Sequence, residues 1–138
     1  MAKKQIKIGV SEGGGPPPGF LWNVWILDLA FDEARDFLDD DKYRHIAFQF
    51  QELASENDPT HSATCDIRAI EDFYELRDWG GVLGGLNVRV FFGVDKMRRT
   101  IVIVGAIQKQ NNGPTPLGDK IRVRRRWRKY GNGDYGYP

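Results

Sequence analysis

The chain has 138 residues, of which 41% are hydrophobic and 12% aromatic, so it is long enough for one domain with one core and too short for two. Its formal net charge is only +1, but residues 1–60 carry 6 Lys and Arg against 11 Asp and Glu, whereas residues 61–138 carry 14 against 8. The basic second half indicates either an anionic partner, of which nucleic acid is the commonest large one, or a solvated surface of mixed charge.

The composition also argues against several classes of protein. The single cysteine, Cys65, cannot form a disulfide within the chain, and no signal-peptide apolar region follows the basic start, so we expect a cytoplasmic protein. The longest apolar run, residues 101–107, is far shorter than the ~20 residues of a membrane span. We therefore expect no membrane association.

Residues 1–19 are predicted to form a flexible tail or linker. Residues 4–8 alternate like a short strand, but residues 11–19 contain three glycines followed by three prolines, which neither a helix nor a central strand accommodates. No Gly-Lys-Ser/Thr follows these glycines, so they do not form a phosphate loop.

The next part of the chain predicts a strand and two helices. Residues 20–29, FLWNVWILDL, are almost entirely apolar and predict a buried strand. Residues 32–38 predict a short helix with acidic residues in its first turn, where the helix dipole favours them. A second helix is predicted from about residue 42 to residue 55, because apolar residues recur along one stripe of it. We expect the two helices to form an antiparallel hairpin on one face of a sheet.

Residues 72–109 hold the strongest strand signals. Their three apolar runs, residues 73–76, 88–94 and 101–107, are rich in β-branched and aromatic residues. A glycine-rich turn separates the first two runs, and the polar link 95–99 joins the second to the third. This pattern predicts an antiparallel meander.

A last helix is predicted for residues 117–130. Thr115 supplies a capping side chain and Pro116 a favourable first helical position. One face of this helix carries the apolar residues Val123, Trp127 and Tyr130. Residues 131–138 show no packing pattern, so we expect a disordered tail.

Together these elements predict one α+β domain over residues 20–130, in the order β-α-α-β-β-β-α. We expect a small, twisted, mainly antiparallel sheet with the helical hairpin on one face, and a C-terminal helix.

Several common site types are absent from the sequence. Two histidines and one cysteine do not form a spaced zinc cluster, and we expect no metal and no cofactor. His45 is interpreted as a surface or partly packed helix residue. The chain has neither a nucleophile elbow nor a dinucleotide-binding fingerprint.

The remaining chemistry lies in cations on the predicted strands. Strand alternation places the Arg89 side chain on the face opposite to Val88 and Val90. It also places Glu75 and Arg77 together on one face of their own strand. We expect Arg77, Arg89 and Lys109 to converge on the face without the hairpin. Such a patch can bind a phosphodiester, whose cleavage by the RNA 2′-hydroxyl needs a base, an acid and a cation. The alternative is structural: Arg77 pairs with a nearby carboxylate, and Arg89 is an ordinary strand residue.

A glycine at position 93 lies on the same predicted face as Arg89. Without a side chain there, a partner could approach the sheet closely.

The same residues carry a resemblance to a known family. The motifs FYELR at 73–77, VRVFFGVD at 88–95, IVIVGAIQK at 101–109 and Thr115-Pro116 resemble the RelE/HigB-type toxins of type II toxin–antitoxin systems, which belong to the RelE/ParE superfamily, and their phage-derived relatives. The resemblance covers about residues 20–130 and is specific over 73–116. It implies a metal-free endoribonuclease, an mRNA interferase, that often acts on mRNA at the ribosome and is held inactive by a cognate antitoxin, here expected to be of helix-turn-helix type.

The resemblance also implies roles for individual residues. Arg77, Arg89 and Lys109 match the family's basic active-site positions, and Glu75 matches the glutamate of its strand motif. The chain departs from the family at Gln110, where a second lysine is usual. A non-catalytic module of the same fold remains an alternative, either a ParE-like inhibitor of a target protein or an RNA-binding protein with a decayed active site.

Further cations are candidates for RNA contact. They lie in the link between the last two strands and along the last helix: Arg98, Arg99, Arg122, Arg124, Arg125, Arg126, Arg128 and Lys129. The alternative is that the helix dipole alone favours cations in the last turns.

Overall fold

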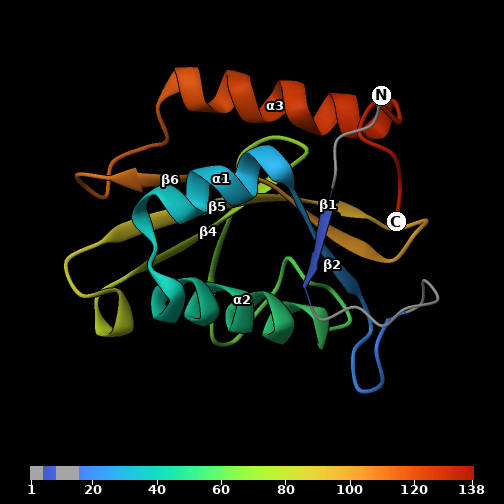
Figure 1. Cartoon of the computed structure of the whole chain (residues 1–138), viewed down its shortest axis with the longest axis horizontal. Coiled ribbons are helices and arrows are strands. Elements are labelled where there is room, and N and C mark those ends of the chain that lie inside the picture. The colour runs from blue at the N-terminus through green and yellow to red at the C-terminus, as the bar shows by residue number, and fades with distance from the viewer. Residues whose placement is uncertain (1–4, 9–15) are drawn as a thin grey trace.

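The computed structural model describes residues 5–8 and 16–138. Figure 1 shows the whole chain. The elements, in chain order, are β1 (Gln5–Ile8), β2 (Asn23–Leu27), α1 (Asp28–Phe37), α2 (Asp40–Ala54), β3 (Asp66–Ala69), β4 (Tyr74–Trp79), the 3-10 turn η1 (Gly81–Leu83), β5 (Asn87–Asp95), β6 (Thr100–Lys109) and α3 (Leu117–Gly131). In the part of the chain described, none of the helices has the length and apolar character that crossing a bilayer requires.

One sheet organises the domain, with strand order β1-β2-β6-β5-β4-β3. All neighbouring strands are antiparallel except β2 and β6, which run parallel. The predicted class, a single α+β domain with a mostly antiparallel sheet, is confirmed. Figure 1 shows α2 and α3 on opposite sides of this sheet.

The structure contains two strands, β1 and β3, that the predicted order of elements lacks. β3 is a short edge strand whose residues are mostly exposed, so it lacks the apolar alternation that predicts strands. β1 lies within the predicted tail 1–19 and pairs with β2. The other predicted tail residues up to 15 lie outside the described part of the chain.

The first helix begins directly where β2 ends, at Asp28, so the predicted strand 20–29 is shorter than expected. β2 pairs only with the first part of β6, and α1 lies beside the part that follows. There the Glu33 carboxylate accepts a hydrogen bond from the backbone N–H of Ala106 at 3.2 Å. A side chain of α1 thus satisfies a donor on the strand edge that β2 leaves open.

The alternation predicted for β5 is confirmed on the face that carries α2. Val88, Val90 and Phe92 are buried, and the Phe92 ring meets the Phe50 ring of α2 edge to face at 5.4 Å. His45 of α2 contacts Asp78 of β4, with 2.6 Å between Nε2 and Oδ2. His45 therefore joins a helix to the sheet, as its interpretation as a partly packed helix residue expected.

The opposite face of β5 is covered by α3 rather than left open along its length. A Cβ atom on Gly93 would lie 2.5 Å from the ring of Trp127. The prediction that Gly93 admits an external partner is therefore wrong, because the group that approaches the sheet there is the chain's own tryptophan.

The predicted disorder of residues 131–138 is also wrong. Tyr135 is buried, and the Tyr137 hydroxyl donates to the carbonyl oxygen of Gly131 at 2.8 Å. The guanidinium of Arg98 lies 3.5 Å from the centre of the Tyr137 ring. Two aromatic side chains give this short segment enough contact area to pack against the end of α3.

Candidate phosphate-binding site

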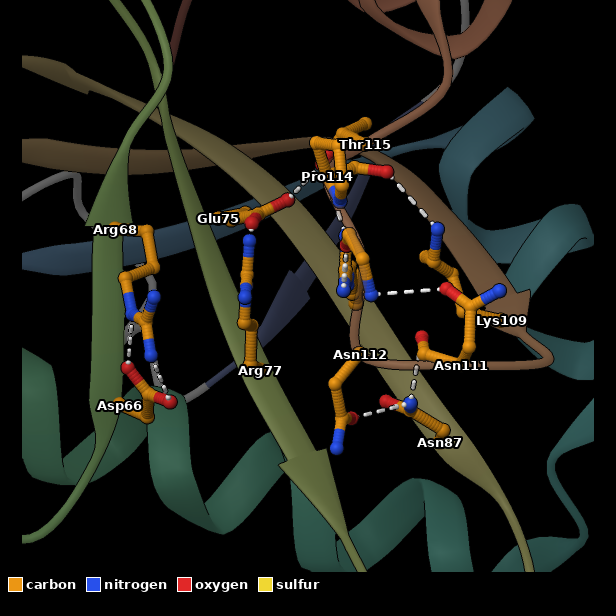
Figure 2. A network of polar contacts seen from close by, with 12 residues as sticks. Asp66, Arg68, Glu75, Arg77, Asn87, Lys109, Asn111, Asn112, Pro114 and Thr115 are labelled. Atoms are coloured by element: carbon orange, nitrogen blue, oxygen red, sulfur yellow. Dashed lines mark hydrogen bonds and ion pairs between the residues drawn. The ribbon is translucent and has the colours of Figure 1, made fainter.

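The predicted site residues lie together on the face of the sheet that carries α3, on strands that α3 leaves partly uncovered. In the strand register Arg77 of β4 lies opposite Arg89 of β5, and Asn87 of β5 lies opposite Lys109 of β6. Glu75 precedes Arg77 by two residues and so shares its face. Figure 2 shows Glu75, Arg77, Asn87 and Lys109 with the loop that follows β6. The expectation that Arg77, Arg89 and Lys109 share one face agrees with this register.

Glu75 is fully buried and is held from two directions. Its Oε1 accepts from Nε of Arg77 at 2.6 Å, and its Oε2 accepts from the hydroxyl of Thr115 at 2.5 Å. The pairing of Arg77 with Glu75 is the one that the structural alternative expected. The two terminal amino groups of Arg77 make no hydrogen bond to the described residues, and 17% of this side chain is exposed. Arg77 therefore keeps donors for an anion after pairing with Glu75.

Arg89 is buried behind the surface of the site. Its Nη2 donates to the carbonyl oxygen of Gly113 at 2.5 Å, and its Nη1 donates to the Thr115 hydroxyl at 3.3 Å. Its Nε has no hydrogen-bond partner among the described residues. Burial lowers the pKa of Arg89, and the carboxylate of Glu75 acts in the opposite direction. An arginine remains charged in such surroundings, so Arg89 adds positive potential beneath the site.

The loop between β6 and α3 covers part of the cluster. Lys109 donates from Nζ to the carbonyl oxygen of Pro114 at 2.9 Å. The amide of Asn87 donates to the backbone of Asn111 at 3.1 Å and to the side chain of Asn112 at 2.9 Å. Loop carbonyl groups thus occupy donors of Arg89 and Lys109. A phosphate oxygen that binds these donors must displace the carbonyl groups.

Thr115 and Asn87 are site residues that the sequence analysis missed. Thr115 was predicted to cap the last helix, but the N-cap is Pro116 and no side-chain cap bond is present. Its hydroxyl instead bridges Arg89 and Glu75. Asn87 was predictable as a neighbour, because it lies two residues before Arg89 on the same face of the strand.

The charges around the cluster are mixed but positive in balance. Arg68 of β3 binds Asp66 through two hydrogen bonds of 2.8 and 3.2 Å. The cluster therefore holds four cations, Arg68, Arg77, Arg89 and Lys109, against two carboxylates, Asp66 and Glu75. In the described part of the chain, no three His, Cys, Asp or Glu residues are grouped to hold a metal ion.

Most of the predicted RNA-binding cations are engaged within the molecule. Arg122 and Arg126 pair with Glu33 of α1, and Arg126 is buried. Arg124 donates hydrogen bonds to both carboxylate oxygens of Glu71. In the described part of the chain, the candidates that are exposed and make no ion pair are Arg125, Arg128 and Lys129.

The two candidates in the link between β5 and β6 are also held. Arg98 pairs with Asp95 at 2.9 Å. Arg99 donates from Nε to the carbonyl oxygen of Leu21 at 2.9 Å and stacks over the Trp22 ring at 4.6 Å. Arg99 also lines a pocket of about 580 Å³ beside Tyr74 and Asp58, and this pocket contains none of the predicted catalytic residues.

Comparison of the chain with protein-family models, with curated proteins and with solved structures finds no match. The resemblance to the RelE/HigB-type toxins therefore depends on the motifs between residues 73 and 116.

Proposed function

We propose that this chain is the toxin of a toxin–antitoxin pair, and that it cleaves mRNA with the scissile phosphate bound at Arg77 and Lys109. The observation that carries the proposal is the cluster itself. Arg77, Arg89, Lys109 and Glu75, chosen from the sequence, lie together on one face of the sheet, partly covered by the loop that follows β6. A positive cluster with free arginine donors suits a phosphodiester.

The proposed reaction uses the RNA's own 2′-hydroxyl as nucleophile. This oxygen attacks the adjacent phosphorus, the bond from phosphorus to the 5′ oxygen breaks, and a cyclic 2′,3′-phosphate and a 5′-hydroxyl result. Arg77 stabilises the additional negative charge on the phosphoryl oxygens. Glu75 is the candidate base for the 2′-hydroxyl proton, and Lys109 is the candidate donor to the leaving oxygen.

A second function is RNA binding without cleavage. The observation that favours it is the burial of Glu75 and Arg89 and their bonds to Thr115 and Gly113. A base that is closed off in this way cannot reach a 2′-hydroxyl unless the loop moves. RNA bound only at the terminal amino groups of Arg77 would not need that movement.

The test removes the two half-buried cations, Arg77 and Lys109, and leaves the buried Arg89 in place. Arg77→Ala with Lys109→Ala is expected to lower RNA cleavage by about 100-fold or more, because both phosphate contacts are lost. Its matched control is Lys42→Ala with Arg44→Ala, which removes the same charge from α2. The readouts are cleavage of an mRNA by purified protein and growth arrest on expression.

Three results decide the proposal. Cleavage by the double variant at the wild-type rate would contradict the site. RNA binding by the wild type with no products would favour the second function. Relief of growth arrest by a helix-turn-helix protein encoded beside this gene would support the toxin–antitoxin pairing.

A further inference from the structure

Trp79 is an exposed tryptophan on the face of the sheet that carries α3. It follows Arg77 by two residues at the end of β4, so both side chains belong to the same face. In the register it lies opposite Asn87, which lies opposite Lys109. Its exposed fraction is 66%, whereas Trp22 and Trp25 are exposed by 5% and 8%.

Among the described residues, this ring is not part of the packed core. Trp79 is absent from the core, while Trp127 packs against that core. Gly80 follows with a φ of 73°, a left-handed conformation that glycine adopts readily, and the chain turns away from the strand there. The indole is therefore left uncovered beside the cation cluster.

We infer that Trp79 is a base-stacking residue: its indole receives an unpaired base of the RNA whose phosphate binds at Arg77 and Lys109. This inference rests on the proposed function and adds a feature of the substrate, a single-stranded nucleotide next to the bound phosphate. Aromatic rings beside backbone-binding cations are the usual platform for single-stranded nucleic acid.

The spacing of the sheet suits this arrangement. Residues two apart on a strand are about 6.6–6.8 Å apart, and neighbouring strands are about 4.7–4.9 Å apart. Trp79 therefore lies beside Arg77 along β4, and two strands away from Lys109. The ring is next to the phosphate position and not above it, so a base attached to the bound nucleotide can reach the indole.

The surroundings of Trp79 favour a base over an apolar protein surface. Its neighbours on this face are Arg77 and Asn87, which are polar. The next exposed apolar residue along the chain is Val82, but it belongs to η1, which contacts α2 on the other side of the sheet. On the sheet itself, the ring thus lies beside side chains that donate hydrogen bonds.

The test measures binding of a fluorescently labelled, single-stranded 2′-O-methyl RNA, which cannot be cleaved by its own 2′-oxygen. Trp79→Leu is expected to weaken binding by about 5- to 150-fold, the loss of one stacked base, whereas Trp79→Phe keeps most of the affinity. Val82→Ala, which truncates another exposed apolar side chain, is the control and should bind like the wild type.

A second RNA contains an abasic nucleotide at each position in turn. At one position, the abasic RNA should bind the wild type more weakly than the intact RNA does. Trp79→Leu should bind this abasic RNA and the intact RNA with equal affinity, because the stacking contact is already missing in that variant. Equal abasic losses in both proteins would overturn the stacking inference. Binding of Trp79→Leu with wild-type affinity would overturn it too, and loss of antitoxin binding in that variant would assign the ring to a protein partner.

The proposed function fails by a different result. If Arg77→Ala with Lys109→Ala abolishes RNA binding while Trp79→Leu does not change it, only the stacking inference is wrong. If the wild type binds no RNA, both are wrong.

Discussion

Tyr130 fixes the end of α3 to the end of β5. Its buried hydroxyl donates to the Asp95 carboxylate at 2.8 Å, and Arg98 binds the same carboxylate. Burial raises the pKa of Tyr130, and the Asp95 carboxylate raises it further. Burial acts to raise the pKa of Asp95 as well, but its hydrogen bonds from Tyr130 and Arg98 outweigh this and leave that pKa below its usual value. Tyr130 lies on the apolar face predicted for this helix, and it is 2% exposed.

The raised pKa of Tyr130 predicts a loss of stability in alkali. The native state binds this proton more tightly than the unfolded state, so the stabilisation is complete below about pH 10, the ordinary tyrosine value, and is lost as the pH rises further. Tyr130→Phe should cost about 1–2 kcal/mol at pH 7, because a hydrogen bond to a carboxylate is lost, and should flatten the alkaline decline. Urea unfolding between pH 7 and 11 measures both effects.

Tyr137→Phe is the control for this experiment, because its hydroxyl binds a backbone carbonyl oxygen and no carboxylate. This variant should keep the alkaline decline of the wild type. An equally steep decline in Tyr130→Phe would show that other groups cause it.

At the scale of residues, the sequence could predict which side chains share the site but not which of their atoms are free. Strand alternation places Glu75, Arg77 and Arg89 on one face, and the register agrees. The groups that engage Arg89, Gly113 and Thr115, lie 24 and 26 positions away along the chain. No local pattern predicts that a distant loop will occupy an arginine's donors.

The packing of α3 on the sheet depends on two glycines in neighbouring strands. Gly93 of β5 lies under Trp127, and a Cβ atom on Gly105 of β6 would lie 3.1 Å from Val123. The helix can approach these strands closely because both positions lack a side chain.

Gly93→Ala is therefore expected to destabilise the fold. The new methyl group would lie 2.5 Å from the Trp127 ring, which no relaxed contact allows, so the helix must shift at a cost of about 1–3 kcal/mol. Gly118→Ala is the matched control, because this helical glycine has nothing within 4 Å of an added Cβ atom. The control should gain about 0.5–1 kcal/mol. Thermal or urea unfolding compares the two, and a Gly93→Ala variant as stable as wild type would contradict this packing.

At the scale of elements, periodicity was informative where an element is long and one of its faces is buried. It predicted α2, β5, β6 and α3 for this reason. It extended the first strand through residue 29, although α1 begins at Asp28, because apolar residues continue through the junction. It missed β3, whose four residues are paired on one side only and are largely exposed.

At the scale of the molecule, the acidic and basic halves of the chain partly neutralise each other. Glu33, from the acidic half, binds Arg122 and Arg126 of α3. The sequence showed the imbalance of charge but not these pairings, since the two elements are about ninety residues apart. The flank of α3 that faces α1 is thereby compensated by Glu33.

The other flank of α3 keeps an excess of positive charge. Lys120, Arg124 and Arg128 are spaced four residues apart and so lie along one side of the helix. The hydrogen bond from Arg124 lowers the pKa of Glu71, and the charges of Arg128 and Lys120 contribute. Glu71 lies just before β4, so this flank borders the beginning of that strand, whose other end carries Arg77 and Trp79. Three cations thus face one carboxylate on the flank of α3 next to the start of β4.

This asymmetry predicts that charge reversal matters on one flank of α3 only. Lys120→Glu with Arg128→Glu should weaken RNA binding by about 10-fold or more and reduce its salt dependence, because these cations lie on the flank of α3 next to β4 and a single carboxylate, Glu71, compensates them. Arg125→Glu with Lys129→Glu changes the net charge equally on the exposed remainder of the helix, and should have a much smaller effect. Affinities for the non-cleavable RNA at several salt concentrations measure the difference. Equal losses in both variants would mean that α3 acts through overall charge and that neither flank contacts the RNA.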